Sequence, residues 1–270
     1  MCLTLLPARF TPTATAQDAD DSWRALLMQG QLALGNNRLA DAEQAYLKAL
    51  HEAEHFGSDD WRVGVTLDGL GQTYTGEKKY SDAETALRRS LEITGKTNGD
   101  DSVEVANVNF DLGSSLLASG RPVQAMPYAR KALSSYVAKL GGTSMEAAGV
   151  YCLEGDSLRA MRNYIDAESP LRQCADIRES NGGIDSPEFA DALYSLALTY
   201  AGEKKYTLAE PRFQLAEKIR ENRLGLTSPI LAQTLEEHAA MLKTMGRDKE
   251  AERLLVLSSA IRRTEQKKTR

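Results

Sequence analysis

A 42-residue period runs through this chain of 270 residues and limits what the chain can fold into. Residues 73–84 (TYTGEKKYSDAE) and 199–210 (TYAGEKKYTLAE) match at nine of twelve positions and lie 126 residues, or three periods, apart. Such self-similarity is typical of repeat architectures, in which each copy packs on the next. One glycine series keeps the spacing throughout: Gly57, Gly99, Gly141, Gly183 and Gly225. We therefore predict six copies of one unit, at residues 22–59, 60–101, 102–143, 144–185, 186–227 and 228–264.

Each copy has the pattern of two α-helices. In the fifth copy, apolar residues recur at spacings of three and four through Phe189 and Leu193, and again through Ala209, Phe213 and Ala216. This periodicity is that of amphipathic helices with one buried face. Small residues stand at one position of each helix, where they let the paired helices approach closely. They are Gly30, Gly71, Gly113, Gly155, Ala197 and Ala239 on the first helices and Ala42, Ala83, Ala125, Ala167, Ala209 and Ala251 on the second.

The helix ends are marked by residues with defined backbone preferences. Ser186 and Ser228 are expected to cap first helices by accepting from N–H groups of the first turn, and Pro187 and Pro229 follow them at the favoured first helical position. The 42-spaced glycines come after the second helices, where a left-handed backbone carries no Cβ penalty. The fold class that follows is all-α.

The series Gly71, Tyr74, Tyr80, Ala83 and Leu87 resembles the tetratricopeptide repeat (TPR). That repeat usually has 34 residues, whereas the longer unit here, with Leu-Gly at 224–225 and Ser-Pro at 228–229, is similar to the kinesin light chain type. The resemblance implies a right-handed superhelical solenoid of six helix-turn-helix repeats, whose first helices line a concave groove. It implies binding of a protein or peptide without naming one, because such repeats serve many unrelated partners.

Composition excludes several classes of protein. The 33 Lys and Arg against 38 Asp and Glu give a net charge of −5, so the chain lacks the broad basic face of a nucleic-acid-binding protein. No stretch approaches the roughly 18 consecutive apolar residues of a membrane span. Phosphate-binding glycine loops and nucleophile elbows are missing from the sequence as well. We therefore expect no enzyme activity and no cofactor.

The two ends of the chain are expected to lie outside the repeats. Residues 14–16 (Ala-Thr-Ala) have the small-x-small pattern of a signal-peptidase site, but residues 1–13 lack a basic start and a long apolar run. Residues 1–21 are thus either the remnant of a signal peptide, which would make the protein periplasmic or secreted, or a disordered tail of a cytoplasmic protein. Residues 265–270 form a basic tail.

Two groups of residues carry a chemical alternative. His51-Glu52-x-x-His55 has the spacing of a zinc-protease helix, but a catalytic zinc needs a third protein ligand, and the one remaining histidine, His238, is four copies away. A zinc metalloprotease is therefore a distant alternative. Cys152 and Cys174 are expected to be small buried residues rather than a bridge.

The groove implied by the resemblance is the best binding hypothesis. Inward-facing residues should recur three to four apart on each first helix and avoid the small-residue face. No set of paired Lys and Asn side chains, with which some TPR domains grip a terminal carboxylate, is present. The expected contact residues are Asp68, Gln72, Asn107, Phe110, Ser114, Asp156, Arg159, Asp191, Tyr194, Leu198, Glu236 and Lys243.

These observations favour a non-enzymatic scaffold for protein–protein interaction. The alternative is a regulatory or substrate-recruiting subunit of an enzyme complex. The last helix adds an association surface, because Val256 and Leu257 face the side where a further helix would stack. We therefore also predict a weak homodimer, or a docked partner, at the C-terminal helix.

Overall fold

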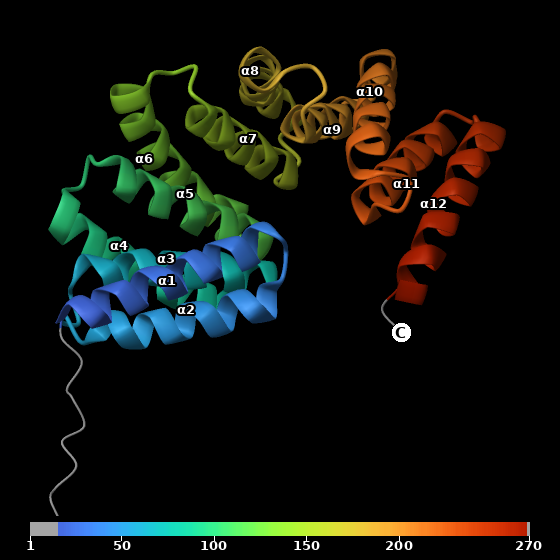
Figure 1. Ribbon diagram of the computed structural model, residues 1–270. Coiled ribbons are helices and arrows are strands. Elements are labelled where there is room, and N and C mark those ends of the chain that lie inside the picture. The colour runs from blue at the N-terminus through green and yellow to red at the C-terminus, as the bar shows by residue number, and fades with distance from the viewer. Residues whose placement is uncertain (1–15, 269–270) are drawn as a thin grey trace, which may run out of the picture. The chain divides into compact units, whose positions relative to one another are not determined.

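The computed structural model describes residues 16–268, with side chains for residues 17–264 (Figure 1). Within that range the chain forms twelve α-helices and no strand. They fall into two compact units, Met1–Asp100 (unit 1) and Asp101–Arg270 (unit 2). Unit 1 contains α1 (Ala16–Gly35), α2 (Leu39–Glu54), α3 (Trp61–Gly76) and α4 (Tyr80–Asn98). Unit 2 contains α5 (Val103–Ala118), α6 (Pro122–Leu140), α7 (Met145–Ala160), α8 (Tyr164–Gly182), α9 (Pro187–Gly202), α10 (Tyr206–Leu224), α11 (Pro229–Thr244) and α12 (Asp248–Lys268).

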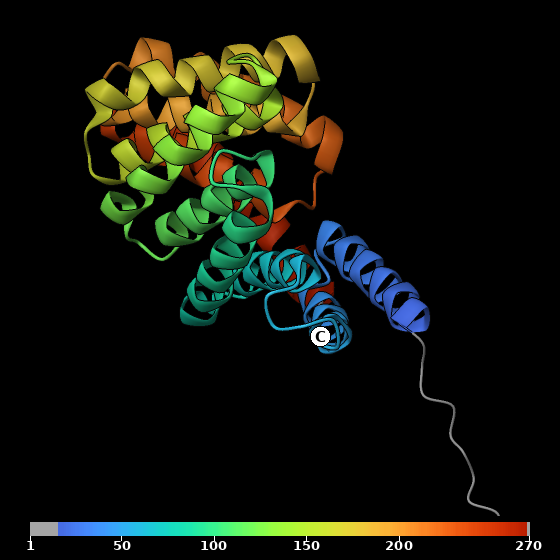
Figure 2. The same ribbon diagram turned by 90° about the vertical axis from the view of Figure 1, so that its left-hand side faces the viewer.

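Consecutive helices pack as pairs, and the pairs stack within each unit (Figures 1 and 2). In unit 2 the first helices α5, α7, α9 and α11 contact one another in order. The second helices contact only first helices in the described part of that unit. The first helices therefore form a continuous inner layer, and the second helices stand apart on the other side. The predicted all-α repeat fold is confirmed.

The predicted small-residue seam is also confirmed. The alanines at 42, 83, 125, 167, 209 and 251 are all fully buried. An ideal Cβ built on Gly71 would lie 2.4 Å from Leu87 Cγ, and one on Gly155 would lie 2.4 Å from Leu171 Cγ. Real Cβ contacts are not that short, so these two glycines are what allow the paired helices to approach as they do.

The helix ends follow the sequence with one exception. Ser102, Ser144 and Ser186 each accept a hydrogen bond from a backbone N–H in the first turn of the following helix. Gly183 has a φ of +86°, as expected for a residue that ends a second helix. Ser228 stands at the corresponding N-cap, but its side chain accepts no capping hydrogen bond. The prediction of a cap was wrong there.

The first helix begins within the segment that we expected to lie outside the repeats. α1 starts at Ala16, and two of its residues bind α3. Asp20 accepts hydrogen bonds of 2.7 Å from both Arg24 and Arg62, which lower the pKa of its carboxyl group. Trp23 is buried and donates to Thr66. Residues 1–15, which carry the signal-peptide hypothesis, lie outside the described residues.

An ion pair joins successive copies at one recurrent place. The Glu that follows the seam alanine meets the basic residue at the start of the next second helix. The pairs are Glu43–Lys79 at 2.9 Å, Glu168–Lys205 at 3.1 Å and Glu210–Arg247 at 2.6 Å. Met126 and Asn163 stand at these two positions between copies three and four, so that boundary is made without the ion pair.

The Glu210–Arg247 pair predicts a pH-dependent contribution to stability. The Arg247 hydrogen bond lowers the pKa of Glu210 from its ordinary value of 4.5. Since the folded-state pKa is the lower one, the contribution is complete above the unfolded pKa and is lost as the pH falls through the folded pKa. Glu210→Gln should therefore lower the free energy of unfolding by up to about 1 kcal/mol at pH 7, and by progressively less as the pH falls below 4.5.

Urea unfolding followed by circular dichroism at several pH values measures this difference. The control is Glu221→Gln, which changes an exposed carboxylate on the same helix. A difference between wild type and Glu210→Gln that did not shrink as the pH fell below 4.5 towards acid unfolding would contradict the assignment.

Candidate functional site

The inner face of unit 2 brings several of the predicted contact residues together. Tyr194 in α9 is half-buried and lies edge-on to Phe213 of α10, with the ring centroids 6.2 Å apart. Arg220, near the end of α10, lies over the same ring, with its guanidinium carbon 4.6 Å from the centre of the Tyr194 ring. Burial, followed by the carboxylate of Glu237, raises the pKa of the Tyr194 phenol. Tyr194 is thus a neutral, firmly held aromatic side chain on this face.

Arg220 is a buried cation that organises this region. Its side chain is 4% exposed, and its Nη2 donates to Asp191 Oδ1 at 2.7 Å. Its Nη1 donates to Thr234 of α11. The Asp191 side chain remains 59% exposed, so its second oxygen faces solvent on the inner layer. Arg220 therefore ties α9, α10 and α11 together beneath the predicted groove.

The neighbouring first helix carries a charged pair. Asp156 and Arg159 of α7 form an ion pair of 3.0 Å and are both partly exposed. Arg178 of α8 lies close to this pair and donates to the backbone oxygen of Glu188 at 2.8 Å. Burial lowers the pKa of Arg178, against the nearby carboxylates of Asp191, Glu188 and Asp156. The region between α7 and α9 thus has charges of both signs.

The other predicted contact residues of unit 2 are more dispersed. Phe110 of α5 is half-buried, and its ring lies 3.4 Å from an ideal Cβ built on Gly149 of α7. Asn107 accepts a hydrogen bond of 2.7 Å from the Tyr136 hydroxyl. Glu236 is held by Arg262 of α12 at 3.1 Å. Ser114 and Leu198 are partly buried and Lys243 is exposed.

Sequence reasoning missed the long side chains that reach the inner layer from the second helices. Tyr136, Arg178, Arg220 and Arg262 stand 42 residues apart, one at the end of each second helix of unit 2. Each makes a polar contact with a first helix or the residues beside it. The 42-residue spacing was the available signal, and it was overlooked because only the first helices were expected to line the groove.

In unit 1, two predicted residues line a separate cavity. Asp68 and Gln72 of α3 lie beside a cavity of about 390 Å³ that is also lined by Leu27 and Leu34 of α1 and by Tyr46 of α2. Burial, with a smaller effect of Asp68, raises the pKa of Tyr46 to about 12. This cavity combines an apolar wall with a carboxylate, an amide and a neutral phenol.

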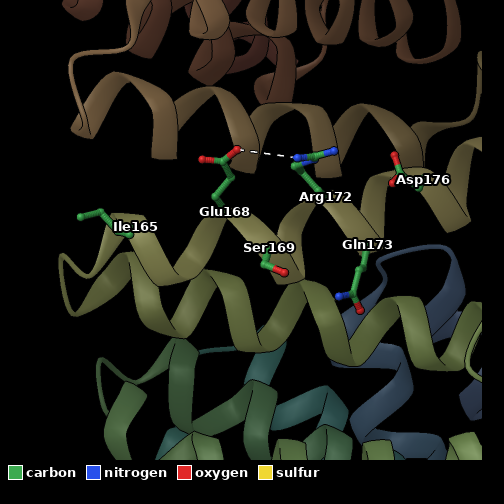
Figure 3. Close-up of a pocket in the computed structure, with 6 residues that line it drawn as sticks. All are labelled: Ile165, Glu168, Ser169, Arg172, Gln173 and Asp176. Carbon is green, nitrogen blue, oxygen red and sulfur yellow. Dashed lines mark ion pairs between the residues drawn. The ribbon is translucent and has the colours of Figure 1, made fainter.

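The outer side of unit 2 contains a cavity that the sequence did not indicate. Its volume is about 410 Å³, and Figure 3 shows its lining side chains along one face of α8, with Glu168 directed at Arg172. A second cavity of about 380 Å³ lies between α6, α7 and α8 and shares two of these residues, Ser169 and Gln173. Both lie where second helices stand apart. The first is lined by Ile165, Glu168, Ser169, Arg172, Gln173 and Asp176.

The two chemical alternatives have different outcomes. His51 of α2 and His55, the residue directly after that helix, are both exposed, and their rings are 5.0 Å apart. Within the described residues, no group of three or more His, Cys, Asp and Glu side chains could hold a metal ion. Cys152 and Cys174, which we expected to be free, are joined by a disulfide bond between α7 and α8. That expectation was wrong, because the helix pair brings their Cα atoms within 5.4 Å.

No helix in the described part of the chain has the length and apolar character needed to cross a bilayer.

The predicted association surface is exposed in α12. Val256 is 63% and Leu257 is 41% exposed, while Ile261 of the same helix is buried. If this strip joins two chains, the wild type should sediment as a concentration-dependent dimer, because burying apolar surface favours association. Val256→Glu/Leu257→Lys should then sediment as a monomer. A wild type that stays monomeric at high concentration would contradict the homodimer.

Comparison with known proteins identifies the repeat. Two tetratricopeptide repeat models match, one over residues 62–138 and one over residues 12–55. No curated protein matches the sequence. The structure of BtubC (BKLC) from P. vanneervenii is similar, with a TM-score of 0.69 and 20% identity over 84% of this chain and 92% of that one.

Two further structures share the fold. A putative kinesin light chain with TPR-like repeats from Podosopora anserina has a TM-score of 0.62 and 17% identity over 75% of this chain and 95% of its own. A Rap protein solved with Competence and Sporulation Factor has a TM-score of 0.65 and 15% identity over 90% of this chain and 75% of its own. Together with the family matches and the helix-pair packing, these likenesses show that the chain has the fold of a tetratricopeptide repeat solenoid.

Proposed function

We propose that this protein is a non-catalytic scaffold that binds a protein or peptide segment on the inner face of unit 2. The observation that carries the proposal is the half-buried Tyr194, which is held by Phe213 and Arg220 and borders the exposed carboxylate of Asp191. A rigid aromatic side chain beside polar groups is typical of the residues that dominate interface energies. The TPR family supports the proposal, since such repeats in general act as scaffolds.

The chemistry of this face favours an extended segment with alternating character. Phe110, Tyr194 and Leu198 offer apolar contacts from two first helices. Asp156 and Arg159 on the helix between them offer a charge of each sign. A peptide with a polar residue between two apolar ones could therefore place its apolar side chains on α5 and α9 and its polar side chain on α7. The Rap protein above, solved with a bound factor, shows that a chain of similar fold takes a ligand.

The experiment removes the two aromatic rings from this face. Peptides are first selected on the wild-type chain from a random display library, and their affinities are measured by fluorescence anisotropy. Phe110→Ala/Tyr194→Ala should bind them at least about 100-fold more weakly, because truncating two hot-spot residues costs roughly 2 kcal/mol each. Far-ultraviolet circular dichroism checks that helicity is retained.

The matched control is Val123→Ala/Ile165→Ala, which removes two exposed apolar side chains from the second helices. This variant should bind like wild type. Unchanged affinity of Phe110→Ala/Tyr194→Ala would reject the inner face as the site, and a loss confined to the control would move the site to the second helices.

A further inference from the structure

The fourth copy is closed by a covalent bond at a place where its neighbours use packing. Cys152 of α7 corresponds by the 42-residue period to Phe110 in copy three and Tyr194 in copy five. Cys174 of α8 corresponds to Ala132 and Ala216, both fully buried. In copy three, Phe110 packs against the buried apolar cluster that contains Ala132. In copy five, Tyr194 packs in the same way against the cluster that contains Ala216. Copy four has a small residue at both positions and joins them through sulfur.

Two further features distinguish copy four in unit 2. α7 has two glycines within the helix, Gly149 and Gly155, and glycine is the least favourable helix residue after proline. Pro170 inside α8 does not distinguish copy four, because Pro127 lies inside α6 and Pro211 inside α10. The ion pair that joins other copies is missing at its boundary with copy three, where Met126 and Asn163 stand.

Copy four also links the two ends of unit 2. In the described part of the unit, α5 and α6 contact α7 and no later helix. α9 packs on both α7 and α8. In a stack of repeats, each copy stabilises only the copies that it contacts directly. An opening between α7 and α8 would therefore leave α5–α7 joined to α9 only through the smaller α7–α9 contact.

We propose that the Cys152–Cys174 bond is a redox-dependent closure of copy four, and that reducing it opens the α7–α8 seam and weakens the coupling between the two ends of unit 2. Cys174 is fully buried and Cys152 is 8% exposed, so the bond is shielded while the copy is closed. The oxidised form belongs to an oxidising compartment, where structural disulfides persist. In a reducing compartment, the same chain would have an open fourth copy.

The chemistry of opening and closing balances with ordinary thiol reagents. In reduction by dithiothreitol, one thiolate of the reagent attacks a protein sulfur, forms a mixed disulfide and releases the other cysteine. The second thiolate of the same reagent molecule then breaks the mixed disulfide and releases the remaining cysteine. The two cysteines gain two electrons and two protons, and the reagent leaves as a cyclic disulfide. In closure by oxidised glutathione, the two protein thiols form the bond and two molecules of reduced glutathione are released.

Hydrogen exchange of the full chain, read by mass spectrometry, tests the proposal. A Cys2→Ser background removes the third thiol. After dithiothreitol, amides of α7 and α8 should exchange at least about tenfold faster than in the oxidised protein, because a disulfide suppresses opening by roughly one to three orders of magnitude. Amides of α11, α12 and unit 1 should not change. Unchanged exchange in α7 and α8, or an equal rise in every helix, would overturn the proposal.

Two variants separate loss of the bond from an effect of the reagent. Cys152→Ala/Cys174→Ala should exchange as fast as the reduced protein, with or without dithiothreitol. Cys152→Phe/Cys174→Ala rebuilds the aromatic–alanine pair of copy three and should exchange slowly in both conditions. If this second variant folds by circular dichroism and yet exchanges as fast as the first, the bond does not take the place of packing and the inference is wrong. If either variant fails to fold, the reduced wild type still decides.

Discussion

Phe213→Ala is expected to lower the free energy of unfolding by about 3–5 kcal/mol, the usual cost of removing a fully buried phenylalanine. Phe213 is 0% exposed in α10. Its ring stacks on His238 of α11, with centroids 5.1 Å apart and planes 7° apart, and it meets Tyr194 of α9 edge-on. Removing it would leave a cavity where three helices meet, and a rigid helix stack closes such a cavity only in part.

Urea unfolding followed by circular dichroism is the measurement. Both tryptophans, Trp23 and Trp61, lie in unit 1, so tryptophan fluorescence would not report on α10. Leu215→Ala is the matched control, because Leu215 is on the same helix but 39% exposed. It should change the free energy of unfolding by less than about 1 kcal/mol. Equal effects of the two substitutions would show that Phe213 does not anchor this part of the stack.

The fold was predictable because the sequence repeats its physical constraints. The alanine of the seam, the residue that caps the first helix and the terminal glycine each restrict one place in the helix pair, and each recurs at 41 or 42 residues. Local preferences and the overall packing therefore agree in most copies. The failure at Ser228 shows the limit, since a residue suited to cap a helix still accepts its hydrogen bond only if the loop orients the side chain.

The candidate site was less predictable, for two physical reasons. Periodicity places apolar side chains on a face, but an arginine near a helix end is normally assigned to solvent, whereas Arg220 is 4% exposed. The second reason is distance in sequence. Cys152 and Cys174 are 22 residues apart, and only the alignment of α7 with α8 shows that they meet. The buried position of Arg220 and the contact between the two cysteines could both have been predicted by comparing equivalent positions in successive copies.

Asp191 and Arg220 should respond very differently to substitution, although they form one ion pair. Asp191→Ala leaves the Arg220 guanidinium buried without a counter-charge, and removing one partner of a buried pair is strongly destabilising. Because Asp191 itself is 59% exposed, we expect a reduced cost of about 1.5–3 kcal/mol. Arg220→Met removes the buried charge instead and leaves a carboxylate that water can reach, so it should change the free energy of unfolding by less than about 1 kcal/mol.

The same urea titrations measure both variants, and the comparison decides what Asp191 does. If Asp191→Ala weakens peptide binding, the loss has two sources, a lost contact and a displaced Arg220 that no longer supports Tyr194. The double variant Asp191→Ala/Arg220→Met separates them, because it lacks the unpaired buried cation and should recover most of the stability lost in Asp191→Ala. Binding that recovers with it assigns Asp191 to positioning Arg220, whereas binding that stays weak assigns it to the ligand. A larger cost for Arg220→Met than for Asp191→Ala would contradict the view that Arg220 is the buried, counter-charge-dependent partner.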